Sequence, residues 1–174
     1  MTFSFADAAE TTRPLYLIEA EGAEAFLAGR PAAERTWLTA SGFAGKLGQL
    51  CLLPGADGAP AGAAFGLGAA SGRRRGRFHV ARAVADLPAG AWHLEGALSP
   101  AEAEEAALGW LLATYRFTRY KPAEAPKARL RPPGGVDAAR VLAIAEGEAL
   151  TRDLINTPAA DKGPAEREAA FVAL

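Results

Sequence analysis

Apolar and polar positions along the chain fall into short apolar runs, which predict strands, and longer stretches with helical spacing. The runs that predict strands are bounded by turn-forming residues; they are 15–20, 49–53, 61–67 and 91–95. The second and third runs enclose Asp57 and Gly58, which predicts a β-hairpin. Residues 128–131 predict an edge strand, which the prolines and glycines at 132–135 end.

Helix signals occur between these runs. Short helices are expected over residues 24–28 and 31–40, and the apolar positions of 77–87 fit neither period cleanly but favour a helix. The clearest start signal begins at Ser99, whose hydroxyl can accept the N–H of Glu102 while the carboxylate reaches back. The helix that follows carries an apolar face formed by Ala103, Ala106, Ala107, Trp110, Leu111 and Thr114. Further apolar residues flank this face, so we expect the helix to be covered on two sides.

The C-terminal part of the sequence predicts two more helices. One is expected to run from about Val136 to Leu154, a length of about 28 Å, and to end before Pro158. The other is expected to begin at Pro164, a favourable first helical residue with acidic residues in the turn that follows. It leads only to the apolar residues 170–174, so we expect its packing partner to lie in a longer protein.

Strands that alternate with helices, together with one hairpin, predict an α/β fold in which helices flank a mixed β-sheet. The 174 residues suit one domain of modest core plus an appendage. The balance of 19 basic against 20 acidic side chains excludes a partner held mainly by overall charge. Cys51 is the single cysteine, so no internal disulfide is possible, and we expect it to be buried. The sequence has neither a secretory-type leader nor a bilayer-spanning run, from which we expect a cytoplasmic location and no membrane partner.

Two glycine-rich stretches invite a nucleotide-binding interpretation. Gly45 and Lys46 lack the earlier glycine and the following hydroxyl of a phosphate-binding loop, because Ala40 and Leu47 occupy those positions. Residues 66–71 nearly match a dinucleotide fingerprint after a strand, with a serine in place of the third glycine. The structural alternative for Gly45 and Lys46 is a glycine-rich turn that leads into a strand. For residues 66–71 it is a tight turn at the end of a strand.

Basic residues gather in two places. Arg73, Arg74 and Arg75, with Arg77 and Arg82, form the densest positive cluster, and residues 116–131 carry six further basic side chains. Either group could contact the phosphates of a nucleic acid without sequence preference. Solvated loops or contacts between subunits are the structural alternatives.

The sequence assigns no catalytic, cofactor-binding or metal-binding residue. His79 and His93 show no metal-ligand spacing with each other, with Cys51 or with an acidic pair, and a structural role is expected for His93 on its strand. Arg152 and Asp153 are neighbours on a predicted helix and point to different faces, so we expect them to make separate structural contacts.

Three sets of motifs carry a family resemblance. They are Arg152–Pro158 with Gly163–Glu166, Ala106–Trp110 with Tyr115–Lys121, and Gly42–Gly48 with Pro54, Gly55 and Gly66–Gly68. In these motifs the sequence resembles the leucyl aminopeptidase family of dinuclear-metal exopeptidases, and the first two are specific. Ala160, Lys162 and the arginine run 73–75 depart from the family pattern.

The resemblance implies a division into three parts. Residues 1–133 would be an N-terminal α/β domain similar to macro domains, 134–158 a linker helix, and 159–174 the start of a truncated catalytic domain. The family's metal ligands, which are a lysine, aspartates and a glutamate, and its catalytic lysine and arginine all belong to the catalytic domain. No residue of this sequence matches them, so we expect the 174-residue chain alone to be inactive.

The resemblance also implies a function for the parent protein. Such enzymes release N-terminal amino acids from peptides with two divalent metal ions, zinc or manganese, and assemble as hexamers. The expected role of this chain is then architectural: to support assembly, to dock on its own catalytic domain and to limit access to the active sites. A macro-like module that binds a nucleotide or nucleic acid is the alternative.

Overall fold

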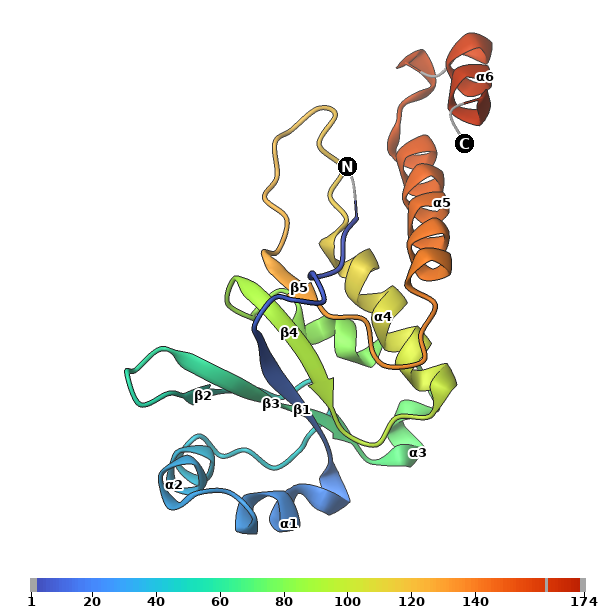
Figure 1. Ribbon diagram of the computed structural model, residues 1–174. Coiled ribbons are helices and arrows are strands. Elements are labelled where there is room, and N and C mark those ends of the chain that lie inside the picture. The colour runs from blue at the N-terminus through green and yellow to red at the C-terminus, as the bar shows by residue number, and fades with distance from the viewer. Residues whose placement is uncertain (1–2, 162, 173–174) are drawn as a thin grey trace.

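The computed structural model describes residues 3–161 and 163–172, which form a mixed sheet with helices on both faces (Figure 1). The strands are β1 Thr12–Glu19, β2 Leu50–Pro54, β3 Pro60–Gly68, β4 Gly90–Glu95 and β5 Ala128–Leu130. Their order across the sheet is β2-β3-β1-β4-β5. β1 runs parallel to β3 and β4, β5 runs parallel to β4, and β2 is antiparallel to β3. The predicted α/β fold, hairpin and edge strand are confirmed.

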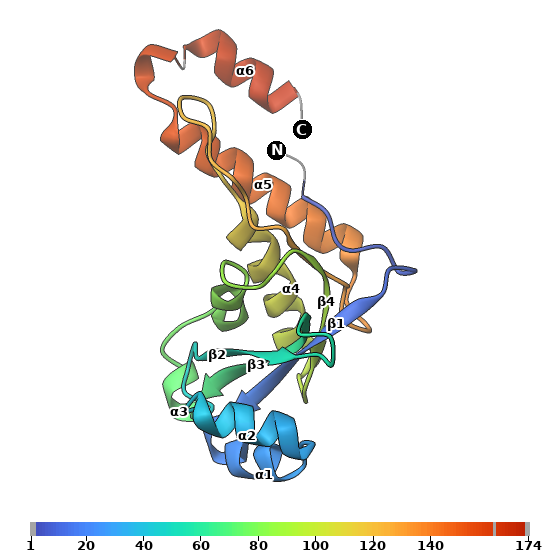
Figure 2. The ribbon, with the colours of Figure 1, turned by 90° about the vertical axis from the view of Figure 1, so that its left-hand side faces the viewer.

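Helices cover the two faces of the sheet (Figure 2). α1 (Ala23–Ala28) and α2 (Ala32–Ala40) lie on one face. α4 (Pro100–Thr114) lies on the other, and α5 (Ala138–Asn156) packs against α4. The remaining helical elements are short or terminal: η1 Ala20–Gly22, α3 Ala70–Arg73, η2 His79–Ala83, η3 Ala159–Asp161 and α6 Pro164–Val172, where η marks a 3₁₀ helix.

The alternation of side chains along the strands divides the apolar interior into two clusters. On the α4 face, Phe65 of β3 joins a large cluster that includes Trp92 and Trp110. On the α1–α2 face the cluster is smaller and contains Leu38, Phe43, Cys51, Leu53 and Ala64. Cys51 is therefore buried, as predicted.

α4 follows its sequence signals closely. The Ser99 hydroxyl accepts the N–H of Glu102 at 3.3 Å, and the Ser99 N–H donates to Oε2 of Glu102 at 2.9 Å. Along the predicted apolar face, all but one residue are buried, and Thr114 is partly buried. η2 and α5 both pack on this helix, so the expected cover on two sides is confirmed.

The helix expected over residues 77–87 is wrong for most of its length. Only His79–Ala83 forms a helix, and it is a 3₁₀ helix. Phe78, directly before it, adopts a left-handed conformation with φ 57° and ψ 35°. A non-glycine residue in that conformation interrupts a right-handed helix, so an α-helix cannot run through this position.

α5 begins and ends slightly later than expected. Asp137 caps it, because its carboxylate accepts the N–H of Arg140 at 3.0 Å. The helix extends through Asn156, since only Thr157, the residue next to Pro158, is forced out of the helical region.

α6 begins at Pro164, as predicted. The expectation that its final apolar residues lack a packing partner falls partly on 173 and 174, which lie outside the described residues. Within the helix, Val172 is 81% exposed. No helix in the described ranges is both long enough and apolar enough to cross a membrane.

Both edges of the sheet receive a hydrogen bond from outside the strands. At one edge, the indole N–H of Trp37, in α2, donates to the carbonyl of Leu52 in β2 at 2.9 Å. At the other, the N–H of Ala6 donates to the carbonyl of Leu130 in β5 at 2.8 Å. The N-terminal segment therefore lies beside β5.

Candidate functional site

The two glycine-rich stretches pack against each other. The N–H of Gly48 donates to the carbonyl of Gly66 at 2.9 Å, and the N–H of Gly68 donates to the carbonyl of Gly45 at 2.9 Å. A Cβ atom at Gly66 would lie only 2.1 Å from the carbonyl oxygen of Lys46. These glycines therefore permit a close backbone contact between the 45–48 loop and β3, which is a structural reason for both stretches.

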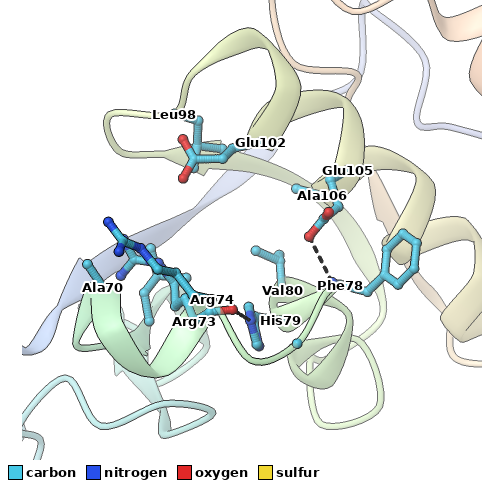
Figure 3. A pocket seen from close by; sticks show the side chains of 12 residues that line it. Ala70, Arg73, Arg74, Phe78, His79, Val80, Leu98, Glu102, Glu105 and Ala106 are labelled. Carbon is cyan, nitrogen blue, oxygen red and sulfur yellow. Dashed lines mark hydrogen bonds between the residues drawn. The ribbon is translucent and has the colours of Figure 1, made fainter.

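A cavity of about 340 Å³ lies beyond the carboxyl end of β3, between α3, η2 and the first half of α4 (Figure 3). β1 continues to α1 and α2 on one face of the sheet, whereas β3 continues to α3 and to η2, which packs on α4. Open α/β sheets hold ligands at the carboxyl ends of neighbouring strands whose connections leave in opposite directions. The position of this cavity makes it the candidate functional site.

The cavity combines an apolar floor with charged walls (Figure 3). Its larger apolar side chains are Leu67, Phe78, Val80 and Leu98. Its charged or titratable side chains are Arg73, Arg74, His79, Glu102 and Glu105. Cavities of this size and mixed lining are typical of small-molecule sites.

The predicted arginine cluster does not form one continuous basic surface. Arg73 forms an ion pair with Glu19 and donates to the carbonyl of Gly68 at 3.2 Å. Arg77 donates to Glu105 at 2.9 Å. Arg74, by contrast, lines the cavity, is exposed and forms no ion pair with a described residue. Pairing with carboxylates reduces the positive potential that this cluster could offer to phosphates.

The α4 side of the cavity presents two carboxylates. The bond from the Ser99 hydroxyl lowers the pKa of Glu102, and the Ser99 backbone N–H and the charge of Arg73 add to this effect. Burial alone would raise the pKa of Glu105, but the bonds that Arg77 and the Phe78 N–H donate to it outweigh burial and lower its pKa. Both side chains are therefore negatively charged near neutral pH.

The two histidines lie in different places. Nε2 of His79 lies 3.0 Å from the carbonyl of Arg73, and the Nδ1 atom of His79 is buried with no partner among the described residues. His93 contacts the hydroxyl of Thr12 at 2.8 Å and the carboxylate of Glu95 at 3.1 Å. Within residues 3–161 and 163–172, no three histidine, cysteine or acidic side chains are grouped as metal ligands would be.

A second arrangement lies at the start of the C-terminal extension, where residues that follow α4 contact the end of α5 and η3. The hydroxyl of Tyr115 donates to Asp153 at 2.5 Å, and the hydroxyl of Tyr120 donates to Asp161 at 2.5 Å. Burial, followed by the Asp153 bond, raises the pKa of Tyr115. No local sequence pattern signals these pairs, because the partners lie 38 and 41 positions apart.

Arg152 and Asp153 bond to different partners, but their contacts are only partly separate, because the Arg152 guanidinium also lies 5.6 Å from the centre of the Tyr115 ring, whose hydroxyl donates to Asp153. Nε of Arg152 donates to Glu148 at 3.0 Å, whereas Asp153 accepts from Tyr115. The motifs at 115–121 and 152–158, separate in sequence, are thus brought together.

Comparison with known proteins decides which family these features belong to. The family described as M17 aminopeptidase, N-terminal domain, matches residues 13–133. The chain belongs to this family. The predicted membership in the leucyl aminopeptidase family is therefore confirmed.

Comparisons with individual proteins agree with this membership. A probable cytosol aminopeptidase from Leifsonia xyli subsp. xyli is 33% identical over 143 residues, which is 74% of this chain and 28% of that protein. The crystal structure of a cytosol aminopeptidase from Coxiella burnetii matches 96% of this chain and 36% of its own with a TM-score of 0.84 and 27% identity. The bottromycin maturation enzyme BotP, in complex with Mn, matches 92% of this chain and 36% of its own, with a TM-score of 0.65 and 26% identity. The chain thus spans between 28% and 36% of the length of these three proteins.

Proposed function

We propose that this chain is the N-terminal domain and linker of a longer leucyl-aminopeptidase-like enzyme, and that its own role is architectural. The observation that carries this proposal is the match of 96% of the chain to 36% of the Coxiella burnetii cytosol aminopeptidase. Residues 1–133 would form the accessory domain, 134–158 the linker helix and 159–174 the start of the catalytic domain. The family match, which ends at residue 133, supports the first boundary.

The complete protein would release N-terminal amino acids from peptides in the cytoplasm. Two divalent ions, zinc or manganese, would be held by the catalytic domain, and the manganese complex of BotP supports a metal-dependent reaction. The 174-residue chain would be inactive alone. The complete protein would assemble as a hexamer, and this domain would control access to the catalytic centres. Any similarity of residues 1–133 to macro domains would be a similarity of fold and not of ligand binding.

The outer surface of α5 supports a docking role. Ile144 and Ile155 are 39% and 74% exposed. They are eleven residues apart, about three turns of 3.6 residues, so they lie on one face of the helix. Exposed apolar side chains aligned in this way are typical of an interaction surface. The bonds from Tyr115 and Tyr120 to Asp153 and Asp161 hold the extension in place.

The nucleotide- and nucleic-acid-binding alternative has weaker support. The glycines that suggested it serve a close backbone contact, and Arg73 and Arg77 are paired with carboxylates. Glu102 and Glu105 would repel a phosphate group that entered the cavity.

The test begins with the gene beyond codon 174. We expect a protein expressed from a continuing frame to hydrolyse leucine p-nitroanilide with Mn²⁺ or Zn²⁺, and the 174-residue chain to show no turnover with either ion. In the longer protein, Ile155→Asp should shift the assembly to smaller species in sedimentation, whereas Glu146→Lys, an exposed site on a different face of α5, should not. Turnover by the 174-residue chain, or an inactive longer protein, would contradict the proposal.

A further inference from the structure

The cavity beyond β3 offers one positive and one negative group that are both able to accept a new partner. Arg74 is exposed and forms no ion pair with a described residue. All the bonds between Ser99 and Glu102 that involve the carboxylate use Oε2, so Oε1 can accept another donor. Figure 3 shows Arg74 on the α3 side of the cavity and Glu102 on the α4 side.

The cavity also has an apolar part, and one of its residues is strained. Leu67, Val80 and Leu98 contribute aliphatic surface. Phe78 is the only non-glycine residue with positive φ in the described chain, and its N–H donates to Glu105 at 2.9 Å. Strained residues occur often at ligand sites, and the surrounding contacts, here the bond to Glu105, keep this wall in a single position.

The charge pattern selects against ligands that carry only negative groups. Glu102 and Glu105 would repel a polyphosphate. The N-terminus of α4 is also a poor anion site, because Ser99 already accepts the N–H of Glu102. A simple amine would leave Arg74 unpaired, so the complementary ligand carries an anion and a cation close together, with an apolar group beside them.

We propose that this cavity binds a free aliphatic α-amino acid, with its carboxylate on Arg74, its ammonium group on Glu102 and its side chain against Leu67, Val80 and Leu98. This inference goes beyond the proposed architectural function and does not depend on it. A charge-assisted contact at each end and an apolar floor distinguish an aliphatic amino acid from its amine and acid fragments.

Calorimetric titration of the 174-residue chain tests the proposal with L-leucine as the probe. Two analogues each remove one charged group: 3-methylbutylamine lacks the carboxylate and 4-methylpentanoate lacks the ammonium group. We expect each analogue to bind at least about tenfold more weakly than leucine, the equivalent of one lost charge-assisted bond. ADP-ribose, titrated in the same way, should give no heat of binding.

Matched variants locate the site. Arg74→Gln should weaken leucine binding at least about tenfold, whereas Arg75→Gln, an exposed neighbour that does not line the cavity, should leave it unchanged. Glu102→Gln should weaken binding of leucine but not of 4-methylpentanoate, and thermal melts confirm that each variant is folded. No binding of leucine at about 10 mM, equal binding of the amine, or the same affinity in the Arg74 and Arg75 variants would overturn the proposal.

Discussion

The two faces of the sheet are built on different principles, and β3 shows the difference within one strand. Phe65 and Leu67 point to the α4 face, where they join large buried side chains such as Trp110. Ala64, on the opposite face, belongs to the smaller cluster, and Gly66 lies against the backbone of the 45–48 loop. The α4 face is therefore stabilised by a large buried apolar area, and the α1–α2 face by a smaller apolar cluster together with a close backbone contact.

The largest effect should come from the α4 face. Trp110 is 1% exposed and donates its indole N–H to the carbonyl of Ala128 at 3.1 Å. Trp110→Ala should lower the free energy of unfolding by about 3–5 kcal/mol, because it leaves a cavity and an unpaired carbonyl. Leu38→Ala, on the other face, should cost about 2–3 kcal/mol, since that smaller cluster can relax. Urea denaturation measures both, and an equal cost would contradict the difference between the faces.

The α1–α2 face should be sensitive to a change that adds only one methyl group. Gly66→Ala would place its Cβ 2.1 Å from the carbonyl oxygen of Lys46, so strand and loop must separate. We expect a loss of roughly 2–3 kcal/mol in urea denaturation. Gly72→Ala is the matched control, because a Cβ there has no atom within 4 Å, and it should be neutral or slightly stabilising. If both variants unfold alike, the close backbone contact is not what stabilises this face.

The smallest effect concerns the start of α4. Ser99→Ala should cost about 1 kcal/mol at pH 7, because it removes the cap of the helix. The Ser99 hydroxyl also lowers the pKa of Glu102, so the part of this stabilisation that needs the Glu102 carboxylate is present above the usual pKa of a glutamate and is lost as the pH falls through the lowered pKa.

Chemical denaturation at pH 7 and pH 3 measures this dependence. The difference in the free energy of unfolding between wild type and Ser99→Ala should be smaller at pH 3 than at pH 7. Ser71→Ala, at an exposed position in α3, should have no effect at either pH. A cost that stays constant with pH would show that the Glu102 carboxylate does not take part.

The sequence predicted the parts of the fold that local pattern determines. The hairpin, the helix that begins after Ser99 and the start at Pro164 each depend on residues that lie close together in the chain. Residues 77–87 were predicted incorrectly because Phe78 is held in its left-handed conformation by Glu105, 27 positions away. No local pattern contains that contact.

The candidate site was less predictable than the fold. The glycines at 45–48 and 66–68 look alike in a nucleotide site and in a close backbone contact, and only the tertiary structure shows which one they serve. The cavity itself joins the end of β3, η2 and α4, which no single stretch of sequence brings together. The sequence identifies Arg74 only as part of a basic cluster, whereas the structure separates it from Arg73 and Arg77, because it forms no ion pair with any described residue.

The contacts at the two edges of the sheet have a consequence for how copies of the chain can meet. A strand from a second molecule can extend a sheet only where an edge offers a row of free backbone groups. At one edge the indole N–H of Trp37 donates to the carbonyl of Leu52, and at the other the N–H of Ala6 donates to the carbonyl of Leu130. A second copy therefore cannot use the carbonyls of Leu52 and Leu130 to extend the sheet without displacing these contacts, whereas side-chain surfaces such as the outer face of α5 carry no such obstacle.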